Sequence, residues 1–284
     1  MKIIHMIDDY KMLCKDIETV GEYEAYKAYT EKYPYFFQGV FKYLYCQPIE
    51  NLKEMIEQVD FNSLLKNAEE NYKTGKVDYI INFMNIFIKK MNVDFDFSFL
   101  IGIEMGNIGG CASPCDTGDP HLYIGIDRAL DKENIGMVIS HELYHMLRAY
   151  MTKESTLDTV FSRMVEEGLA SYSSLWAHNM EWNAINIAKT LSVSEKQVNN
   201  LLNNTNMLIE RIVADGEKPI SVETMSEYFV ADESDVEFPV IGYYVGLYLT
   251  HLSVEQGVEF ERFISMPLED IIGMWLKALK SIKK

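Results

Sequence analysis

Residues 141–145 read His-Glu-Leu-Tyr-His and place a carboxylate between two imidazoles. On a helix, residues four apart share one face, so His141 and His145 can reach the same metal ion. Glu142 is turned ~100° from His141 by helix geometry, so it flanks the ion instead of binding it. A carboxylate in that position can take a proton from a water molecule on the metal. The spacing therefore predicts a zinc hydrolase with Glu142 as general base.

The third metal ligand must come from another element, because a catalytic zinc site normally takes three protein ligands. The pair Glu166-Glu167 supplies two candidates on a second expected helix. The buried stripe of that helix is expected to contain Phe161, Val165, Gly168, Tyr172 and Leu175. Glu167 borders this stripe beside Ser171, which is a candidate to orient it, whereas Glu166 falls on a polar face. We therefore expect Glu167 to be the ligand, with Glu166 as the alternative. Gly168 has no Cβ and is expected to let this helix approach the His helix closely.

These two segments carry a family resemblance. The pairing of His141–His145 with residues 167–172, Glu-Gly-Leu-Ala-Ser-Tyr, resembles the gluzincin metallopeptidases, which share a thermolysin-like catalytic core. The second segment is especially similar to the glutamate helix of aminopeptidase-N-like enzymes. In that family the Glu before Gly is the third zinc ligand, so the resemblance also implies Glu167. The spacing from His145 to Glu167 is a few residues longer than in those enzymes, which implies a short insertion between the helices.

A third segment is similar to the same group. Residues 243–246, Tyr-Tyr-Val-Gly, fit the Tyr-x-x-Gly pattern whose tyrosine stabilises the tetrahedral intermediate in aminopeptidase-N-like enzymes. A phenol hydroxyl near zinc can donate a hydrogen bond to a developing oxyanion. The resemblance implies Tyr243 in this role, with Tyr244 as second candidate, although Val245 stands where the family usually has lysine. The alternative is that both aromatic rings simply pack in a buried helix.

The aminopeptidase motif Gly-x-Met-Glu-Asn is absent from the chain. Residues 103–107 read Ile-Glu-Met-Gly-Asn, which offers some of the same residues in another order. No site for a free substrate amino group is therefore predicted, and exopeptidase activity has no support. The resemblance covers about residues 122–172 and the short Tyr243 segment, and nothing in residues 1–92.

The elements that position these residues follow from hydrophobic periodicity. Residues 1–92 read as successive amphipathic helices, among them 61–71 and 77–91. From residue 93 to about 106, apolar and polar residues alternate, which is typical of a half-buried strand. Glycines and prolines then indicate a long irregular loop to residue 120, and 122–126 reads as a second short strand. We expect a helical N-terminal region, 1–92, and a catalytic domain, 93–284.

After residue 127 the pattern is helical again. Expected helices span about 132–150, which carries the His pair, 158–179, which carries the Glu pair, 221–229, 239–254 and 268–282. Ser192 or Ser194 is expected to cap another helix that reaches about residue 214. The apolar stripe of the His helix is expected to consist of Ile139, Leu143, Met146 and Leu147. The predicted fold class is α+β and mostly helical, with a small sheet preceding the His helix, as a gluzincin-like catalytic domain requires.

Charge and apolar content exclude several classes of partner. A formal net charge of −17 disfavours nucleic acid, whose phosphates need a basic surface, and it attracts cationic ligands such as basic peptides. The acidic stretch 223–237 reads as a solvated loop. Asp8 and Asp9 interrupt the N-terminal apolar run too early for a signal peptide, and no stretch approaches the ~20 apolar residues of a membrane span. A cytoplasmic protein without membrane partners is expected.

The four cysteines, Cys14, Cys46, Cys111 and Cys115, are expected to be reduced thiols. Cys111 and Cys115 are close enough to form a redox bridge or to share a second metal with His121, but such a zinc site lacks a fourth nitrogen or sulfur ligand nearby. The remaining histidines, His5, His121, His178 and His251, have no suitably spaced partner and are expected to be structural.

The sequence therefore predicts zinc-dependent hydrolysis of a peptide or protein substrate. Zn²⁺ is expected on His141, His145 and Glu167, with Glu142 as base and Tyr243 at the oxyanion. Two alternatives stay open: a catalytically inactive gluzincin-fold binding or regulatory module, and a zinc hydrolase of a non-peptide amide. The sequence leaves the oligomeric state undetermined.

Overall fold

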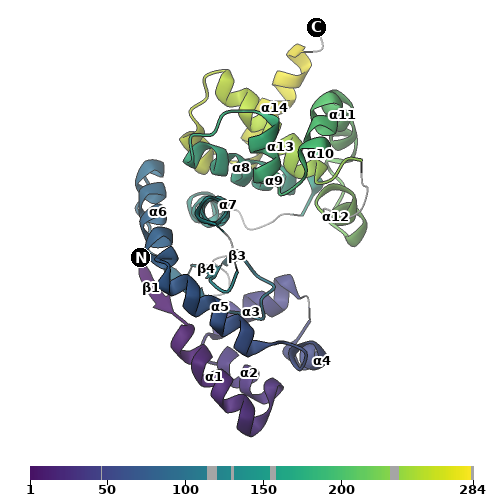
Figure 1. The fold of residues 1–284 in the computed structure, drawn as a ribbon. Helices are drawn as coiled ribbons and strands as arrows, with labels where there is room; N and C mark the ends of the chain where they lie inside the picture. The colour runs from purple at the N-terminus through teal and green to yellow at the C-terminus, as the bar shows by residue number, and fades with distance from the viewer. Residues whose placement is uncertain (46, 114–119, 129–130, 154–157, 231–236, 283–284) are drawn as a thin grey trace. The chain divides into compact units, whose positions relative to one another are not determined.

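The computed structural model describes residues 1–284 except 46, 114–119, 129–130, 154–157, 231–236 and 283–284 (Figure 1). The described chain is mostly helical with a small sheet, in agreement with the predicted α+β class. It divides into two compact units, Met1–Met146 and Leu147–Lys284. The division falls inside one helix, so a domain boundary near residue 93 stays a prediction.

The first unit contains a four-stranded sheet in the order β1-β2-β4-β3. Its strands are β1 (Lys2–His5), β2 (Ser98–Gly102), β3 (Gly110–Ser113) and β4 (His121–Gly125). β1 pairs with β2 and β2 with β4 in parallel, whereas β3 runs antiparallel to β4 at the edge. All residues of β4 are buried, as is typical of a strand with neighbours on both sides.

The helices of the first unit lie mostly between β1 and β2 in the chain. They are α1 (Ile7–Val20), α2 (Glu22–Thr30), α3 (Pro34–Gly39), the π-helix η1 (Val40–Leu44), the 3-10 helix η2 (Ile49–Leu52), α4 (Lys53–Ile56), α5 (Phe61–Lys73) and α6 (Lys76–Met91). The Asp60 side chain caps α5 by accepting a hydrogen bond from the Ser63 N–H. Asn92 ends α6 in the left-handed conformation that this residue type tolerates. These helices bury aromatic rings of Tyr26, Tyr29 and Phe37 against one another.

The second unit is helical. After α7 (Lys132–Thr152), which begins in the first unit, it contains α8 (Val160–Ala177), α9 (Ala184–Leu191), α10 (Glu195–Asn203), α11 (Thr205–Asp215), α12 (Val222–Tyr228), α13 (Ile241–Glu255), the 3-10 helix η4 (Phe260–Ile264) and α14 (Leu268–Ile282). Thr159, Ser194 and Ser221 begin α8, α10 and α12 with reciprocal capping boxes. Each helix start is therefore fixed by a local polar contact.

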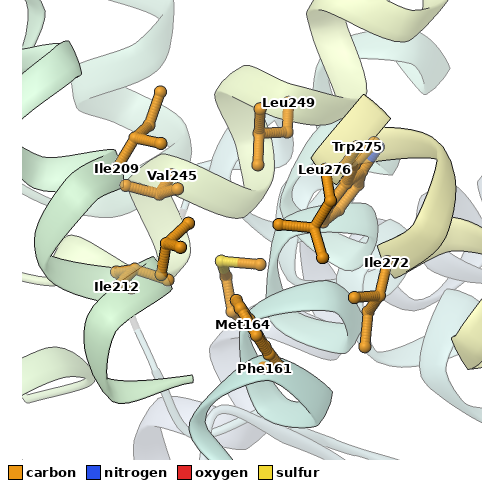
Figure 2. Close-up of a pocket in the computed structure, with 10 residues that line it drawn as sticks. Phe161, Met164, Ile209, Ile212, Val245, Leu249, Ile272, Trp275 and Leu276 are labelled. Carbon is orange, nitrogen blue, oxygen red and sulfur yellow. The ribbon is translucent and has the colours of Figure 1, made fainter. Parts of the chain in front are cut away.

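Apolar side chains from α8, α11, α13 and α14 converge in the second unit (Figure 2). They line a small pocket that contains no titratable side chain: Phe161, Met164, Ile209, Ile212, Val213, Val245, Leu249, Ile272, Trp275 and Leu276. The indole N–H of Trp275 donates to the Ser253 hydroxyl at 3.1 Å. This region is hydrophobic core and offers no group that could do chemistry.

Four sequence-based expectations were wrong in detail. The N-terminal region is not purely helical, because Lys2–His5 forms β1 and extends the sheet. The expected strand at 93–106 is confined to Ser98–Gly102, and the expected loop up to residue 120 contains β3. The single helix expected between Ser194 and residue 214 is two helices, α10 and α11, which meet at Asn204. Ser194 caps α10, while Ser192 ends α9.

No described helix is both long and apolar enough to cross a bilayer. Of the acidic stretch 223–237, residues 231–236 lie outside the described residues. In the described part of the stretch, Glu227 forms an ion pair with Arg211.

Candidate metal centre

α7 presents the two histidines on one face, as the spacing predicts. Asp131 caps the helix by accepting the Asn134 N–H at 2.8 Å. The expected apolar stripe is confirmed, because Ile139, Leu143, Met146 and Leu147 are all buried. His141 and His145 are half-buried, and their Nε2 atoms lie 3.1 Å apart. The apolar stripe packs α7 against the core, and both imidazoles lie on the partly exposed side of the helix.

This separation suits a shared zinc ion. Two ligands of a tetrahedral zinc at ~2.0–2.1 Å lie about 3.3–3.4 Å apart, close to the distance between the two Nε2 atoms. His141, His145 and Glu167 each offer one ligand atom, and these atoms all lie within 4.8 Å of one another. Two imidazoles and one carboxylate are a donor set that zinc accepts, with one position left for water. The residues present therefore fit a catalytic zinc ion.

The carboxylate of Glu142 is held by the edge strand. Its Oε2 accepts the backbone N–H of Ala112 in β3 at 3.1 Å. The strand comes this close because Gly110 has no side chain: a Cβ there would lie 2.7 Å from Val138 Cγ1 and 3.4 Å from Glu142 Cγ. The orientation of the candidate base thus depends on a strand that the sequence pattern did not reveal.

Cys111 lies in this same strand and is a free thiol. Burial raises its pKa well above the ordinary value, and the nearby carboxylates of Glu142 and Glu104 raise it further. A thiol kept protonated in this way is a poor metal ligand and a weak nucleophile. Cys14 is also free and buried, whereas Cys46 and Cys115 lie outside the described residues, so a bridge or second site at 111–115 stays untested.

Glu166 is engaged by a buried arginine. Arg148, on the last turns of α7, places its Nε 2.5 Å from Glu166 Oε1. The same guanidinium donates to the backbone carbonyls of Phe263 and Met266 at 2.6 and 2.8 Å. Arg148 is fully buried, so these contacts tie α7 to α8 inside the second unit. They also occupy the carboxylate that was the alternative metal ligand.

Glu167 has a different partner, which the sequence analysis missed. The Nη2 atom of Arg163 lies 3.2 Å from Glu167 Oε1, one helical turn away. The guanidinium also stands over the Phe229 ring, 5.6 Å from its centre. The signal was present in the i, i+4 spacing, which puts both side chains on one helix face. Arg163 supplies a positive charge beside the candidate carboxylate ligand.

The two tyrosines of residues 243–246 differ in environment. Tyr244 is fully buried, and its hydroxyl pairs with the Thr205 hydroxyl at 2.5 Å. Tyr243 is half-buried, with its ring edge-on to Phe229 at 6.0 Å between centres. Phe229 therefore contacts both Arg163 and Tyr243. Gly242 makes room for it, because a Cβ there would lie 2.2 Å from the Phe229 ring.

Gly168 does approach another helix closely, and the contact that the structure gives is with α13. The expected approach to the His helix stays a prediction. A Cβ on Gly168 would lie 2.3 Å from the carbonyl carbon of Gly246. Conversely, a Cβ on Gly246 would lie 2.2 Å from the Met164 carbonyl oxygen. The glycines of the Glu-Gly and Tyr-x-x-Gly segments thus face each other at one helix crossing, and either side chain would force the helices apart.

The remaining histidines have structural surroundings. His5 pairs with the Tyr72 hydroxyl, His178 with the Ser174 carbonyl, and His251 stacks on Trp182 with 4.1 Å between ring centres. His121 is buried beside the Phe36 ring. Ser171, one turn beyond Glu167, has a buried hydroxyl with no hydrogen-bond partner among the described residues.

One of three comparisons with known proteins gave a match. Searches of curated proteins and of solved structures each found no match to the chain. A family model matches residues 89–261, which include α7, α8 and α13, and its family is described as "Putative zinc dependent peptidase (DUF5700)". Because the match covers more than half of the sequence, the chain belongs to the DUF5700 family.

Proposed function

We propose that this protein hydrolyses peptide bonds with a zinc ion held by His141, His145 and Glu167. The observation that carries the proposal is the grouping of these three ligand atoms within 4.8 Å. Family membership supports it independently, because the match was made to the sequence pattern and not to the geometry. Kinship with the gluzincins, and with aminopeptidase-N-like enzymes in particular, belongs to the same proposal.

Bound zinc would lower the pKa of water to about 7 and polarise a substrate carbonyl. Glu142 acts as general base: it accepts a proton from the attacking water and returns it to the leaving amine. The Ala112 N–H fixes the carboxylate for this transfer by holding Oε2 at 3.1 Å. Tyr243 donates a hydrogen bond to the oxyanion. Tyr244 is less suited, because its hydroxyl is engaged with Thr205.

Arg163 has a supporting role in this proposal. Its ion pair with Glu167 Oε1 restrains the carboxylate and balances part of its charge. A ligand that is already oriented loses less side-chain freedom when the metal binds. Arg163 is thus a positioning residue for the third ligand.

The substrate is a peptide or protein, and the formal charge of −17 favours basic segments by long-range attraction. A cytoplasmic location is proposed on the same sequence grounds as before. Neither feature enters the chemistry at the metal.

The decisive experiment compares the wild-type protein with Glu142→Gln. Loss of the base should reduce cleavage of a diverse peptide library by about 10²–10⁴-fold while zinc stays stoichiometric. Glu133→Gln, an exposed carboxylate on the first turn of the same helix, is the matched control and should cleave normally. Substantial turnover by Glu142→Gln would refute the mechanism. Stoichiometric zinc without cleavage by the wild-type protein would favour the binding-module alternative.

A further inference from the structure

Two adjacent parallel strands, β2 and β4, lead into nearly the same tetrapeptide at their carboxyl ends. Residues 101–104 read Ile-Gly-Ile-Glu and residues 124–127 read Ile-Gly-Ile-Asp. β2 and β4 pair in a register that aligns the two glycines with each other. Glu104 and Asp127 each lie two residues beyond these paired glycines, so they hold matching positions just past the ends of the two strands. Two carboxyl groups therefore emerge together at the carboxyl ends of these strands.

Both carboxyl groups are buried, and each has an oxygen without a partner. Glu104 is 0 % exposed and Asp127 is 4 % exposed. Glu104 Oε1 accepts hydrogen bonds from the Tyr45 and Tyr26 hydroxyls at 2.8 and 3.2 Å. Glu104 Oε2 and Asp127 Oδ1 have no hydrogen-bond partner among the described residues. A buried polar atom in this state destabilises the fold, and more so when it is charged.

Two phenol hydroxyls share this surrounding. Tyr10 and Tyr123 are fully buried, and neither hydroxyl has a hydrogen-bond partner in the described part of the chain. Burial raises the pKa of both phenols, and the carboxyl groups of Asp127 and Glu104 raise each of them further. Both hydroxyls are therefore electrostatically coupled to both carboxyl groups. Each of the four groups has a buried oxygen without a hydrogen-bond partner among the described residues.

A glycine lets a backbone carbonyl come close to one of these carboxyl groups. A Cβ on Gly125 would lie 3.3 Å from Asp127 Oδ1 and 2.3 Å from the backbone carbonyl oxygen of Ile108. The missing side chain thus allows the Ile108 carbonyl oxygen to approach β4 beside the Asp127 carboxyl group. An alanine at this position would clash with that oxygen.

The cluster is also short of positive charge. Burial raises the pKa of both Glu104 and Asp127, and Arg128 only partly offsets this at Asp127, because its guanidinium donates to the carbonyls of Asn107 and Gly106 at 2.7 and 3.4 Å. Glu104 forms no ion pair within the described residues. Without a counter-charge a buried carboxyl group favours its neutral form, whereas a bound cation would stabilise the ionised form.

We propose that this cluster is a second metal site, which binds a hard divalent cation of the Ca²⁺ class. Its donors are the carboxylates of Glu104 and Asp127, the two phenol oxygens and the Ile108 carbonyl. Such cations take oxygen ligands, whereas zinc and other borderline metals prefer the nitrogen and sulfur that this cluster lacks. Ca²⁺ takes six to eight oxygens, so water completes the shell. The site lies wholly within the first unit and does not depend on the proposed peptidase activity.

The full-length protein tests this through its own tyrosines. Tb³⁺ replaces Ca²⁺ at oxygen sites and emits when a nearby phenol is excited, so zinc-saturated protein should give saturable emission that Ca²⁺ displaces. Calorimetry with Ca²⁺ should give a dissociation constant of roughly 10⁻⁶–10⁻⁴ M. Glu104→Gln and Asp127→Asn should each weaken binding at least about 10-fold, as loss of a metal-orienting group does. Asp94→Asn, an exposed acid preceding the same strand, should leave binding unchanged.

Two further variants keep the outcome decisive. Tyr123→Phe removes one hydroxyl and leaves both acids, so it should weaken binding even if the acid variants fold poorly. Glu167→Gln alters the candidate zinc centre and should leave the Tb³⁺ signal intact. Absent binding, equal binding in the Glu104→Gln/Asp127→Asn double variant, or loss of the signal only in Glu167→Gln would overturn the proposal. A high-resolution structure with only water between the carboxyl groups at millimolar Ca²⁺ would do so too.

Discussion

The crossing of α8 and α13 makes a strong prediction about single methyl groups. Gly168→Ala and Gly246→Ala each add one carbon to a helix, which ordinarily stabilises it. In this protein the added Cβ would meet backbone atoms of the neighbouring helix at 2.3 and 2.2 Å. Gly273 in α14 is the matched control, because a Cβ there has no atom within 4 Å. The same substitution is therefore expected to have opposite effects at these positions.

The magnitudes follow from the distances. Ordinary van der Waals contacts of a Cβ lie at 3.4–4 Å, so the two backbones must separate by about 1 Å or more. Overpacking of this kind costs about 1–3 kcal/mol and sometimes more, because main-chain atoms cannot rotate away. Alanine recovers up to ~1 kcal/mol of helix propensity. We expect a net loss of about 1–3 kcal/mol for Gly168→Ala and Gly246→Ala, and a gain of about 0.5–1 kcal/mol for Gly273→Ala.

Urea unfolding followed by circular dichroism measures these differences, and zinc titration shows whether displacement of α8 reaches Glu167. Each kcal/mol should move the melting temperature by about 2–4 °C in a unit of this size. Gly168→Ala should also weaken zinc binding, whereas Gly273→Ala should not. If all three variants unfold within about 0.5 kcal/mol of the wild-type protein, the close approach of the two helices is wrong.

The other predictions concern the charges around the centre and one histidine. Arg163→Met should weaken zinc binding by about 10- to 100-fold with little loss of stability, and Arg163→Lys should weaken zinc binding less. Competition with a chromogenic chelator measures the zinc affinities. Equal affinities of the wild-type protein and Arg163→Met would contradict the positioning role. Glu167→Gln should lose stoichiometric zinc, whereas Glu166→Gln should keep it. Glu166→Gln should instead lower the unfolding free energy by about 3 kcal/mol or more, because Arg148 is left buried without its carboxylate partner. Loss of zinc in Glu166→Gln but not in Glu167→Gln would make Glu166 the ligand. Burial lowers the pKa of His251 below 6.5, so its contribution to stability is full above that pH and declines on acidification. His251→Phe keeps the stacking on Trp182 and should reduce the loss of stability between about pH 6.5 and 5. Urea unfolding at several pH values measures this loss. An unfolding free energy that falls with pH as steeply as in the wild-type protein would refute the prediction.

Long periodic segments were the most predictable part of the fold. The helix expected at 268–282 coincides with α14, and the His helix differs from α7 only at its C-terminal end. Their apolar residues recur over several turns, so a single register is favoured. β1 and β3 have four residues each, too few for a period to emerge, and their pairing depends on distant strands.

The candidate metal centre also contains features that the sequence predicts and features that it does not. The spacing of His141 and His145 and the face of Glu167 are local helix properties, and the structure groups these three side chains. Their role as zinc ligands stays a proposal. The Ala112 contact with Glu142 could not be predicted, because it joins an irregular segment to a helix. The contact of Gly168 with α13 was not predicted, because a glycine in the sequence shows that something comes close but not which element does.

The close contact between Gly168 and Gly246 also implies an order of folding events. Four helices separate Gly168 from Gly246 in the chain, so α8 gains this support only after a long loop has closed. During synthesis both histidines and both glutamates emerge before α13 exists. A metal ion that binds then meets ligands whose helix still lacks a docking partner. We therefore expect high-affinity metal uptake to be a late step of folding, which protects the nascent chain from committing early to a wrong ion.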